Sequence, residues 1–135
     1  MPVRYLLDSN TCIAILRNLP SAIQGMAAVS PDECGISTIT AYELHTGVEK
    51  CARPDKERAK VELLLATVHQ LPFETEAAKE AARVRAVLES NGLMIGPYDV
   101  LLAGQALASS LILVTANTGE VSRVLGLTLE NWISS

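Results

Sequence analysis

The sequence contains no apolar run that approaches the roughly twenty residues needed by a membrane-spanning helix. Its first segment, MPVRYLLD, reaches an acid too early for a secretory signal peptide, so we expect a cytosolic protein with no membrane partner. Linkers, internal repeats and low-complexity stretches are also missing. The chain has 135 residues, 49% of them hydrophobic, which is enough apolar material for the core of a single domain spanning residues 1–135.

Cysteine and aromatic residues are scarce. The three cysteines, Cys12, Cys34 and Cys51, are an odd number and show neither a CxxC pair nor the Cys/His spacing of a zinc site. We interpret them as reduced packing residues. Aromatic residues make up only 4% of the chain, so we do not expect stacking to be the main route to nucleic-acid binding, and we interpret Trp132 as a packing residue.

Positive charge is in deficit. The net charge of -4 argues mildly against a nucleic-acid partner, because such partners usually select a basic surface. Five of the eleven basic residues nevertheless lie in one stretch, KCARPDKERAK, namely Lys50, Arg53, Lys56, Arg58 and Lys60. This stretch fits a solvated helix pair with internal ion pairs about as well as it fits a binding surface.

Short apolar strands alternate with helical segments along the chain. Strands are predicted at residues 3–8, 34–39, 69–73, 111–115 and 127–132, and helices at residues 9–18, 40–52, 55–68, 75–92 and 97–110. This order predicts an α/β fold with a mostly parallel central sheet of four to five strands and helices on both faces. Gly47, inside the second of these helices, is expected to allow a close helix contact.

Polar and acidic residues recur where the predicted strands end. Asp8 ends the first strand, Glu43 lies in the first turn of the helix after the second, and Asn117 and Glu120 follow the fourth. Asp99, at the start of its helix, can point to the same edge. Because the carboxyl ends of parallel strands meet at one edge of a sheet, these residues are candidates for a common site.

Helix capping explains some of these acids without any function. Thr40-x-x-Glu43 matches a capping box, and Asn117-x-x-Glu120 could cap a short helix in the same way. Asp99 lies two residues after Pro97, which suits the first turn of a helix, and an acid in that turn complements the helix dipole.

Asp8 is harder to explain as a structural residue. It closes a strand of apolar side chains, where a buried carboxylate costs several kcal/mol unless a cation meets it. Basic partners are few, because no lysine follows Lys79 and Arg123 is the only basic residue among the last fifty. Several acids at one edge without basic partners favour a bound hard cation, Mg²⁺ or Mn²⁺.

Four blocks of the sequence resemble the PIN-domain ribonuclease toxins of the VapBC toxin–antitoxin type. In order and spacing they cover the chain from end to end: YLLDSN, TITAYELHTGVEK, IGPYDVLLAGQALA and LVTANTGEVSRVLGLTLENW. The last block departs from the family pattern at Val121 and Leu125, where Phe and Pro are common. These departures concern local loop packing and leave the acids in place.

The resemblance implies a three-layer PIN-like fold and a Mg²⁺-dependent endoribonuclease that inhibits growth by cleaving RNA. In this view Asp8 and Asp99 are the principal metal ligands, and Glu43 is a ligand or a water-orienting base. Asn117 and Glu120 would be outer groups or serve a second metal ion. Two supporting positions, Ser9 and Asn10, follow Asp8 as in the family, with Ser9 where Thr is more common.

The resemblance also implies partners. These are an RNA substrate, with tRNA as the family's common target, a second copy of the chain in a homodimer, and an antitoxin. The C-terminal segment of such an antitoxin would cover the acidic site, often with an arginine, which suits the charge here.

Other classes of protein share some of these features. A haloacid-dehalogenase-type phosphatase, which is Mg²⁺-dependent, or a receiver domain also begins with a strand that ends in Asp. Both need a lysine late in the chain, and none follows Lys79. A catalytically silent PIN-like interaction module is the remaining alternative, although the acids of an active site are all present.

Overall fold

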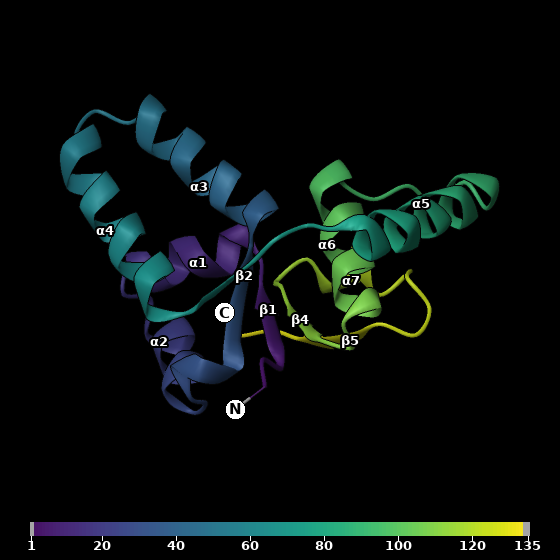
Figure 1. The fold of residues 1–135 in the computed structure, drawn as a ribbon, viewed down its shortest axis with the longest axis horizontal. Coiled ribbons are helices and arrows are strands. Elements are labelled where there is room, and N and C mark those ends of the chain that lie inside the picture. The colour runs from purple at the N-terminus through teal and green to yellow at the C-terminus, as the bar shows by residue number, and fades with distance from the viewer. Residues whose placement is uncertain (1, 134–135) are drawn as a thin grey trace.

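A five-stranded parallel sheet forms the centre of the fold (Figure 1). The computed structural model describes residues 2–133. The strands lie in the order β3-β2-β1-β4-β5, and all four pairings are parallel. They are β1 (Tyr5–Leu7), β2 (Cys34–Ser37), β3 (His69–Leu71), β4 (Ile112–Val114) and β5 (Thr128–Glu130). The predicted α/β class and parallel sheet are confirmed.

Helices cover both faces of this sheet, as predicted (Figure 1). One group comprises α1 (Ser9–Leu16), α2 (Pro20–Ala27), α3 (Thr38–Lys50) and α4 (Pro54–Thr67). The other comprises α5 (Thr75–Ser90), α6 (Pro97–Ala108) and the short α7 (Thr118–Val121). None of the helices within residues 2–133 has the length and apolar content to cross a membrane.

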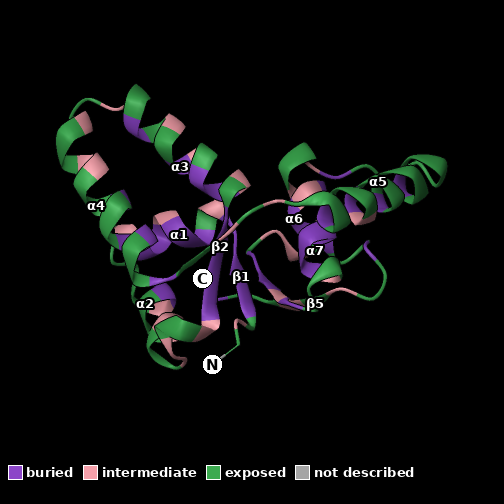
Figure 2. Ribbon diagram, viewed as in Figure 1, coloured by how far each residue is buried: buried purple, intermediate pink, exposed green. Residues whose placement is uncertain are grey.

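Strand β1 shows why the sheet needs helices on two sides. Tyr5 and Leu7 join a buried cluster with side chains of α1, α2, α3 and α4, whereas Leu6 joins a second cluster with residues of α6. All three residues are buried (Figure 2). Successive side chains of a strand point to opposite faces, so a wholly apolar strand requires cover on both.

Helices α5 and α6 pack closely because of a glycine that the sequence analysis did not single out. A Cβ at Gly104 would lie 2.4 Å from the backbone nitrogen of Ala81, which only glycine avoids. The predicted close contact at Gly47 is wrong, since a Cβ there would meet nothing within 4 Å in the described chain. Gly47 lies on an exposed part of α3.

Helix α2 is absent from the sequence-based prediction, although Pro20 at its first turn is a typical start signal. Trp132 packs against this helix. A Cβ at Gly25 would lie 2.5 Å from Cγ of Trp132, and the indole also packs on Tyr5, with ring centroids 5.8 Å apart. Trp132 is buried, which confirms its interpretation as a packing residue.

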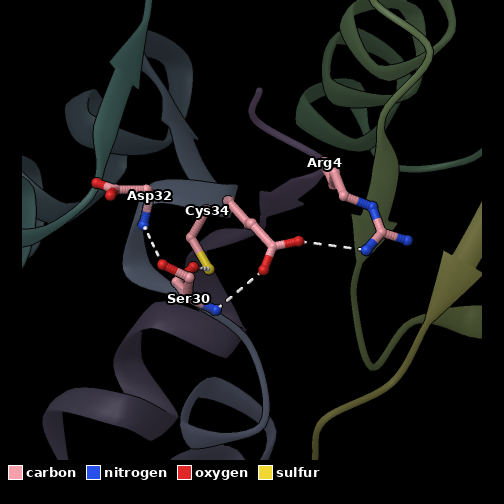
Figure 3. A network of polar contacts seen from close by, with 5 residues as sticks. Arg4, Ser30, Asp32 and Cys34 are labelled. Carbon is pink, nitrogen blue, oxygen red and sulfur yellow. Dashed lines mark hydrogen bonds and ion pairs between the residues drawn. The ribbon is translucent and has the colours of Figure 1, made fainter. Parts of the chain in front are cut away.

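The turn into β2 was also not predicted. It is a single 3₁₀ turn, η1 (Pro31–Glu33), that begins with a capping box at Ser30 (Figure 3). The Glu33 carboxylate accepts from the Ser30 backbone nitrogen at 3.2 Å and also pairs with Arg4 at 3.2 Å. Arg4 precedes β1 and Glu33 precedes β2, so this network joins the amino ends of two neighbouring strands.

The three cysteines are free thiols, as expected for packing residues. Cys12 and Cys34 are buried, and burial raises the pKa of the Cys34 thiol to about 11. Burial also raises the pKa of Cys12, with a further contribution from the charge of Asp8. Neither thiol is therefore a reactive thiolate at neutral pH.

Candidate active site

The predicted site residues come together at the carboxyl edge of the sheet. Four parts of the chain contribute to one pocket of about 460 Å³: the junction between β1 and α1, helix α3, the start of α6 and the segment after β4. Six of the seven predicted residues line this pocket, namely Asp8, Ser9, Asn10, Glu43, Asp99 and Asn117. The seventh, Glu120, is joined to the pocket through Asn117, whose side-chain nitrogen donates to Glu120 Oε2 at 2.7 Å.

Asp8 has both a structural and a site position. It is the N-cap of α1, and its Oδ1 accepts from the Thr11 backbone nitrogen at 2.8 Å. The residue is only 4% exposed. Because the helix begins directly at the end of β1, the same turn that caps α1 directs Asp8 into the pocket.

Glu43 lies in the second turn of α3, so the predicted capping box with Thr40 is wrong. The N-cap is Ser37, whose Oγ accepts from the Ile39 backbone nitrogen at 3.1 Å. Ser37 is the last residue with extended backbone, and the helix therefore begins before Thr40. Glu43 instead accepts a hydrogen bond from Ser9 Oγ at 3.3 Å, the kind of orienting contact expected of Ser9.

Asn117 occupies the N-cap position of α7, but its side chain does not cap that helix. The capping box predicted for Asn117 and Glu120 is therefore also wrong. The side-chain nitrogen donates to Asp99 Oδ2 at 2.9 Å as well as to Glu120. Capping would use the side-chain oxygen of Asn117 as an acceptor, whereas these charge-assisted bonds use its nitrogen as a donor and fix the orientation of the amide between the two carboxylates.

Asp99 lies in the first turn of α6 behind Pro97, as predicted. The first turn of α6 therefore also places Asp99 in the lining of the pocket. Burial raises the pKa of Asp99, the hydrogen bond from Asn117 opposes that shift, and the charges of Asp8 and Glu120 add to it. Asp99 therefore bears the electrostatic effect of both neighbouring acids.

Similar opposing effects act on the pKa of Glu43. Burial raises the pKa of its carboxyl group, the hydrogen bond from Ser9 lowers it, and the charges of Asp99 and Asp8 raise it further. The side chains lining the pocket in the described chain include no lysine, arginine or histidine. The acids thus repel one another without a protein cation to compensate them.

This donor set suits a hard divalent cation. Mg²⁺ prefers oxygen ligands and is usually held by one or two carboxylates together with several waters. Asp8, Glu43 and Asp99 supply such oxygens around one pocket. Within residues 2–133, however, no three His, Cys, Asp or Glu side chains are already arranged as a group that could hold a metal ion. The ligand set remains a prediction.

One feature of the pocket is not among the predicted site residues. Tyr98 lines it, and its ring lies 6.0 Å from that of Tyr42, measured between centroids. Each tyrosine immediately precedes a predicted site acid, in Tyr42-Glu43 and in Tyr98-Asp99. That repeated dipeptide pattern is the signal that could have identified the pair.

Comparison with known proteins agrees with the fold. A family model for the PIN domain matches residues 5–124. The tRNA(fMet)-specific endonuclease VapC of Salmonella typhimurium is 35% identical over 130 residues, which covers 96% of this chain and 98% of the relative.

Solved structures give the same result. The crystal structure of DNA-bound VapBC from Salmonella typhimurium superposes with a TM-score of 0.91 at 35% identity, covering 97% of this chain and 99% of the matched chain. The structure of VapBC2 from Rickettsia felis, bound to a fragment of its promoter DNA, gives a TM-score of 0.89 at 29% identity, covering 98% and 100%. With the family model, the full-length relatives and the solved structures in agreement, this chain belongs to the PIN-domain family and, within it, to the VapC ribonucleases.

Proposed function

We propose that this protein is the toxin of a VapBC-type toxin–antitoxin pair and a metal-dependent endoribonuclease. The observation that carries the proposal is the convergence of Asp8, Glu43, Asp99 and Asn117 on one pocket that no described basic side chain lines. Full-length relatives named as VapC ribonucleases support the reaction class. Asp8 and Asp99 would hold Mg²⁺ or Mn²⁺, with Glu43 as a third ligand or as a base.

A bound divalent ion supplies charge that stabilises the reacting phosphodiester and lowers the pKa of a water molecule. The residues of this chain position the reactants around it. Glu43 is suited to accept a proton, because its raised pKa brings it closer to neutral pH, where a general base is most effective. Ser9 holds the Glu43 carboxylate, and Asn117 orients Asp99 and Glu120 by donating to both.

Two protein partners belong to the proposal. The first is a cognate antitoxin whose C-terminal segment enters the acidic pocket with a basic side chain, because such a group would neutralise the repelling acids. The second is another copy of the chain in a homodimer. The solved relatives described as VapBC support the antitoxin. A tRNA is the proposed RNA target, since the Salmonella relative is named a tRNA(fMet)-specific endonuclease.

The test is direct cleavage of RNA by the purified protein. Total tRNA is incubated with the protein in Mg²⁺, in Mn²⁺ or in EDTA, with and without the cognate antitoxin, and the new RNA ends are sequenced. We expect defined internal cuts that need the metal and disappear when the antitoxin is added. Intact RNA under every condition would refute the enzyme and favour an interaction module that has the fold without the activity.

A further inference from the structure

Two exposed tyrosines contact each other beside the pocket that Asp8, Glu43 and Asp99 line. Tyr42 of α3 is 57% exposed and Tyr98 of α6 is 39% exposed. Their ring centroids are 6.0 Å apart and the ring planes are tilted by 56°. Tyr98 also lines the pocket that contains Asp99 and Glu43. The pair therefore presents aromatic faces to solvent immediately beside the predicted reaction site.

The other aromatic pair behaves differently. Tyr5 and Trp132 are 7% and 6% exposed and pack on each other inside the core. Burial of those rings accounts for their contribution to folding. Tyr42 and Tyr98 leave much of their surface in water, so core packing does not account for their position.

The composition of the pocket decides what such rings could bind. The described side chains that line it include no cationic group, and its carboxylates repel phosphates. Protein contacts that hold a nucleotide at this place must therefore come largely from uncharged groups. Stacking on an aromatic ring is the contact of this kind that every nucleobase can make, and it needs a base that is not already stacked in a duplex.

We propose that Tyr98, supported by Tyr42, is a stacking platform for an unpaired RNA base next to the phosphodiester that is cleaved. This inference rests on the proposed endoribonuclease function and deepens it, because it identifies residues that position the substrate. It also revises the expectation from composition. Aromatic residues are only 4% of the chain, but two of its three tyrosines lie together, and one of them, Tyr98, lines the pocket.

The experiment uses the full-length protein and a single-stranded RNA oligonucleotide that carries 2-aminopurine, a base whose fluorescence falls when it stacks. Initial cleavage rates in Mg²⁺ give kcat and KM, and quenching on titration with protein in EDTA reports stacking separately from cleavage. The variants are Tyr98→Ala, Tyr98→Phe and Tyr42→Ala. Leu63→Ala is the matched control, because Leu63 is a large exposed side chain that does not line the pocket.

Tyr98→Ala should raise KM by about tenfold or more, with a smaller change in kcat, and should abolish the quenching. Tyr98→Phe keeps the ring and should remain close to wild type, Tyr42→Ala should lie between these two, and Leu63→Ala should change neither reading. Thermal melts of all four variants identify any loss of folding, and Tyr98→Phe against Tyr98→Ala then still compares ring with no ring.

Several outcomes would overturn the platform. Wild-type KM and quenching in Tyr98→Ala would do so, and so would equal damage in Tyr98→Phe, which would assign the effect to the hydroxyl. A changed oligomeric state of Tyr98→Ala or Tyr42→Ala in sedimentation would assign the rings to a contact between copies. If wild type fails to cleave RNA in any metal, the proposed function fails, while quenching still decides the stacking proposal by itself.

Discussion

Carboxylates at the two ends of the central sheet differ in whether they have a basic partner. At the amino end, the Glu33 carboxylate pairs with Arg4 and accepts a backbone hydrogen bond. At the carboxyl end, Asp8, Glu43 and Asp99 gather around a pocket whose described lining has no basic side chain. All ion pairs found within residues 2–133 lie outside this pocket, for example between Arg58 and Glu49 and between Arg83 and Glu80.

This difference distinguishes acids that already have a basic partner in the protein from acids that lack one and are suited to bind a cation. An acid with a protein partner is already compensated, and at an exposed site the pair contributes little to stability. Acids that repel one another without a protein cation have no such compensation and gain most when a divalent cation binds. Substitutions at the two ends should therefore have different consequences for cleavage, for stability and for the response to metal.

The largest effect is expected on cleavage. Asp8→Asn or Asp99→Asn should lower the rate of RNA cleavage by at least roughly a hundredfold, because each removes the charge of a metal ligand. Asparagine is as good an N-cap as aspartate, so Asp8→Asn should keep the start of α1 intact. Glu33→Gln, at the other end of the sheet, is the control and should cleave like wild type. Full activity in both aspartate variants would break the assignment.

Asn117→Ala should have a smaller effect on cleavage, roughly tenfold, because the amide orients two carboxylates but supplies no charge. Loss of its hydrogen bond should raise the pKa of Asp99 further, since that bond lowers it in the wild type. The acidic limb of the pH–rate profile should therefore move to higher pH. Asn131→Ala, in the exposed segment after β5, should leave the limb in place. An unshifted limb in Asn117→Ala would contradict this role.

Stability should change in the opposite direction from activity. The raised pKa values of Glu43 and Asp99 mean that the folded state holds protons more tightly than the unfolded chain. The stability that these groups contribute is present below the usual carboxyl pKa and is lost as pH rises through the raised folded values. In EDTA at neutral pH, Asp99→Asn should thus melt on the order of a few degrees above wild type.

Addition of Mg²⁺ tests the same prediction from the other side. A ligand that binds only the folded state raises its melting temperature, so Mg²⁺ should stabilise wild type more than Asp99→Asn and close the gap. Glu33→Gln should instead melt at or below wild type in EDTA and should respond to Mg²⁺ as wild type does. If Asp99→Asn melts lower in EDTA and neither protein responds to Mg²⁺, the acids do not act on one another.

The smallest effect is expected at the basic stretch of α4. Lys60 already pairs with Glu57 at 3.5 Å, and Arg58 pairs with Asp55 at 3.2 Å. Much of the positive charge of this stretch is therefore compensated. The double variant Lys56→Ala, Lys60→Ala should change the salt dependence of RNA binding by less than about one unit of log–log slope. Binding is measured by anisotropy over a series of salt concentrations. A reduction near two units would show that this helix contacts phosphates.

Some site residues could be found in the sequence because their local signals are strong. Asp8 follows an apolar strand and Asp99 follows Pro97, and both positions depend on residues only a few places away. Local signals also misled. Thr40 and Glu43 have the spacing of a capping box, but Ser37 caps the helix and Thr40 is buried, with no hydrogen-bond partner for its Oγ1 in the described chain.

The sequence by itself determined the alternation of apolar strands and helices, and with it the parallel sheet and the edge at which its acids would meet. That inference is possible because burial on both faces of a strand leaves a continuous apolar run, and because parallel strands end at one edge. Only the tertiary structure decided which partners the polar side chains chose. Asn117 donates to Asp99, eighteen positions away, as well as to Glu120 in the helix that follows it, and Tyr42 of α3 lies against Tyr98 of α6. Such contacts depend on how close two elements lie after packing, and this distance cannot be inferred from the spacing of residues along the chain.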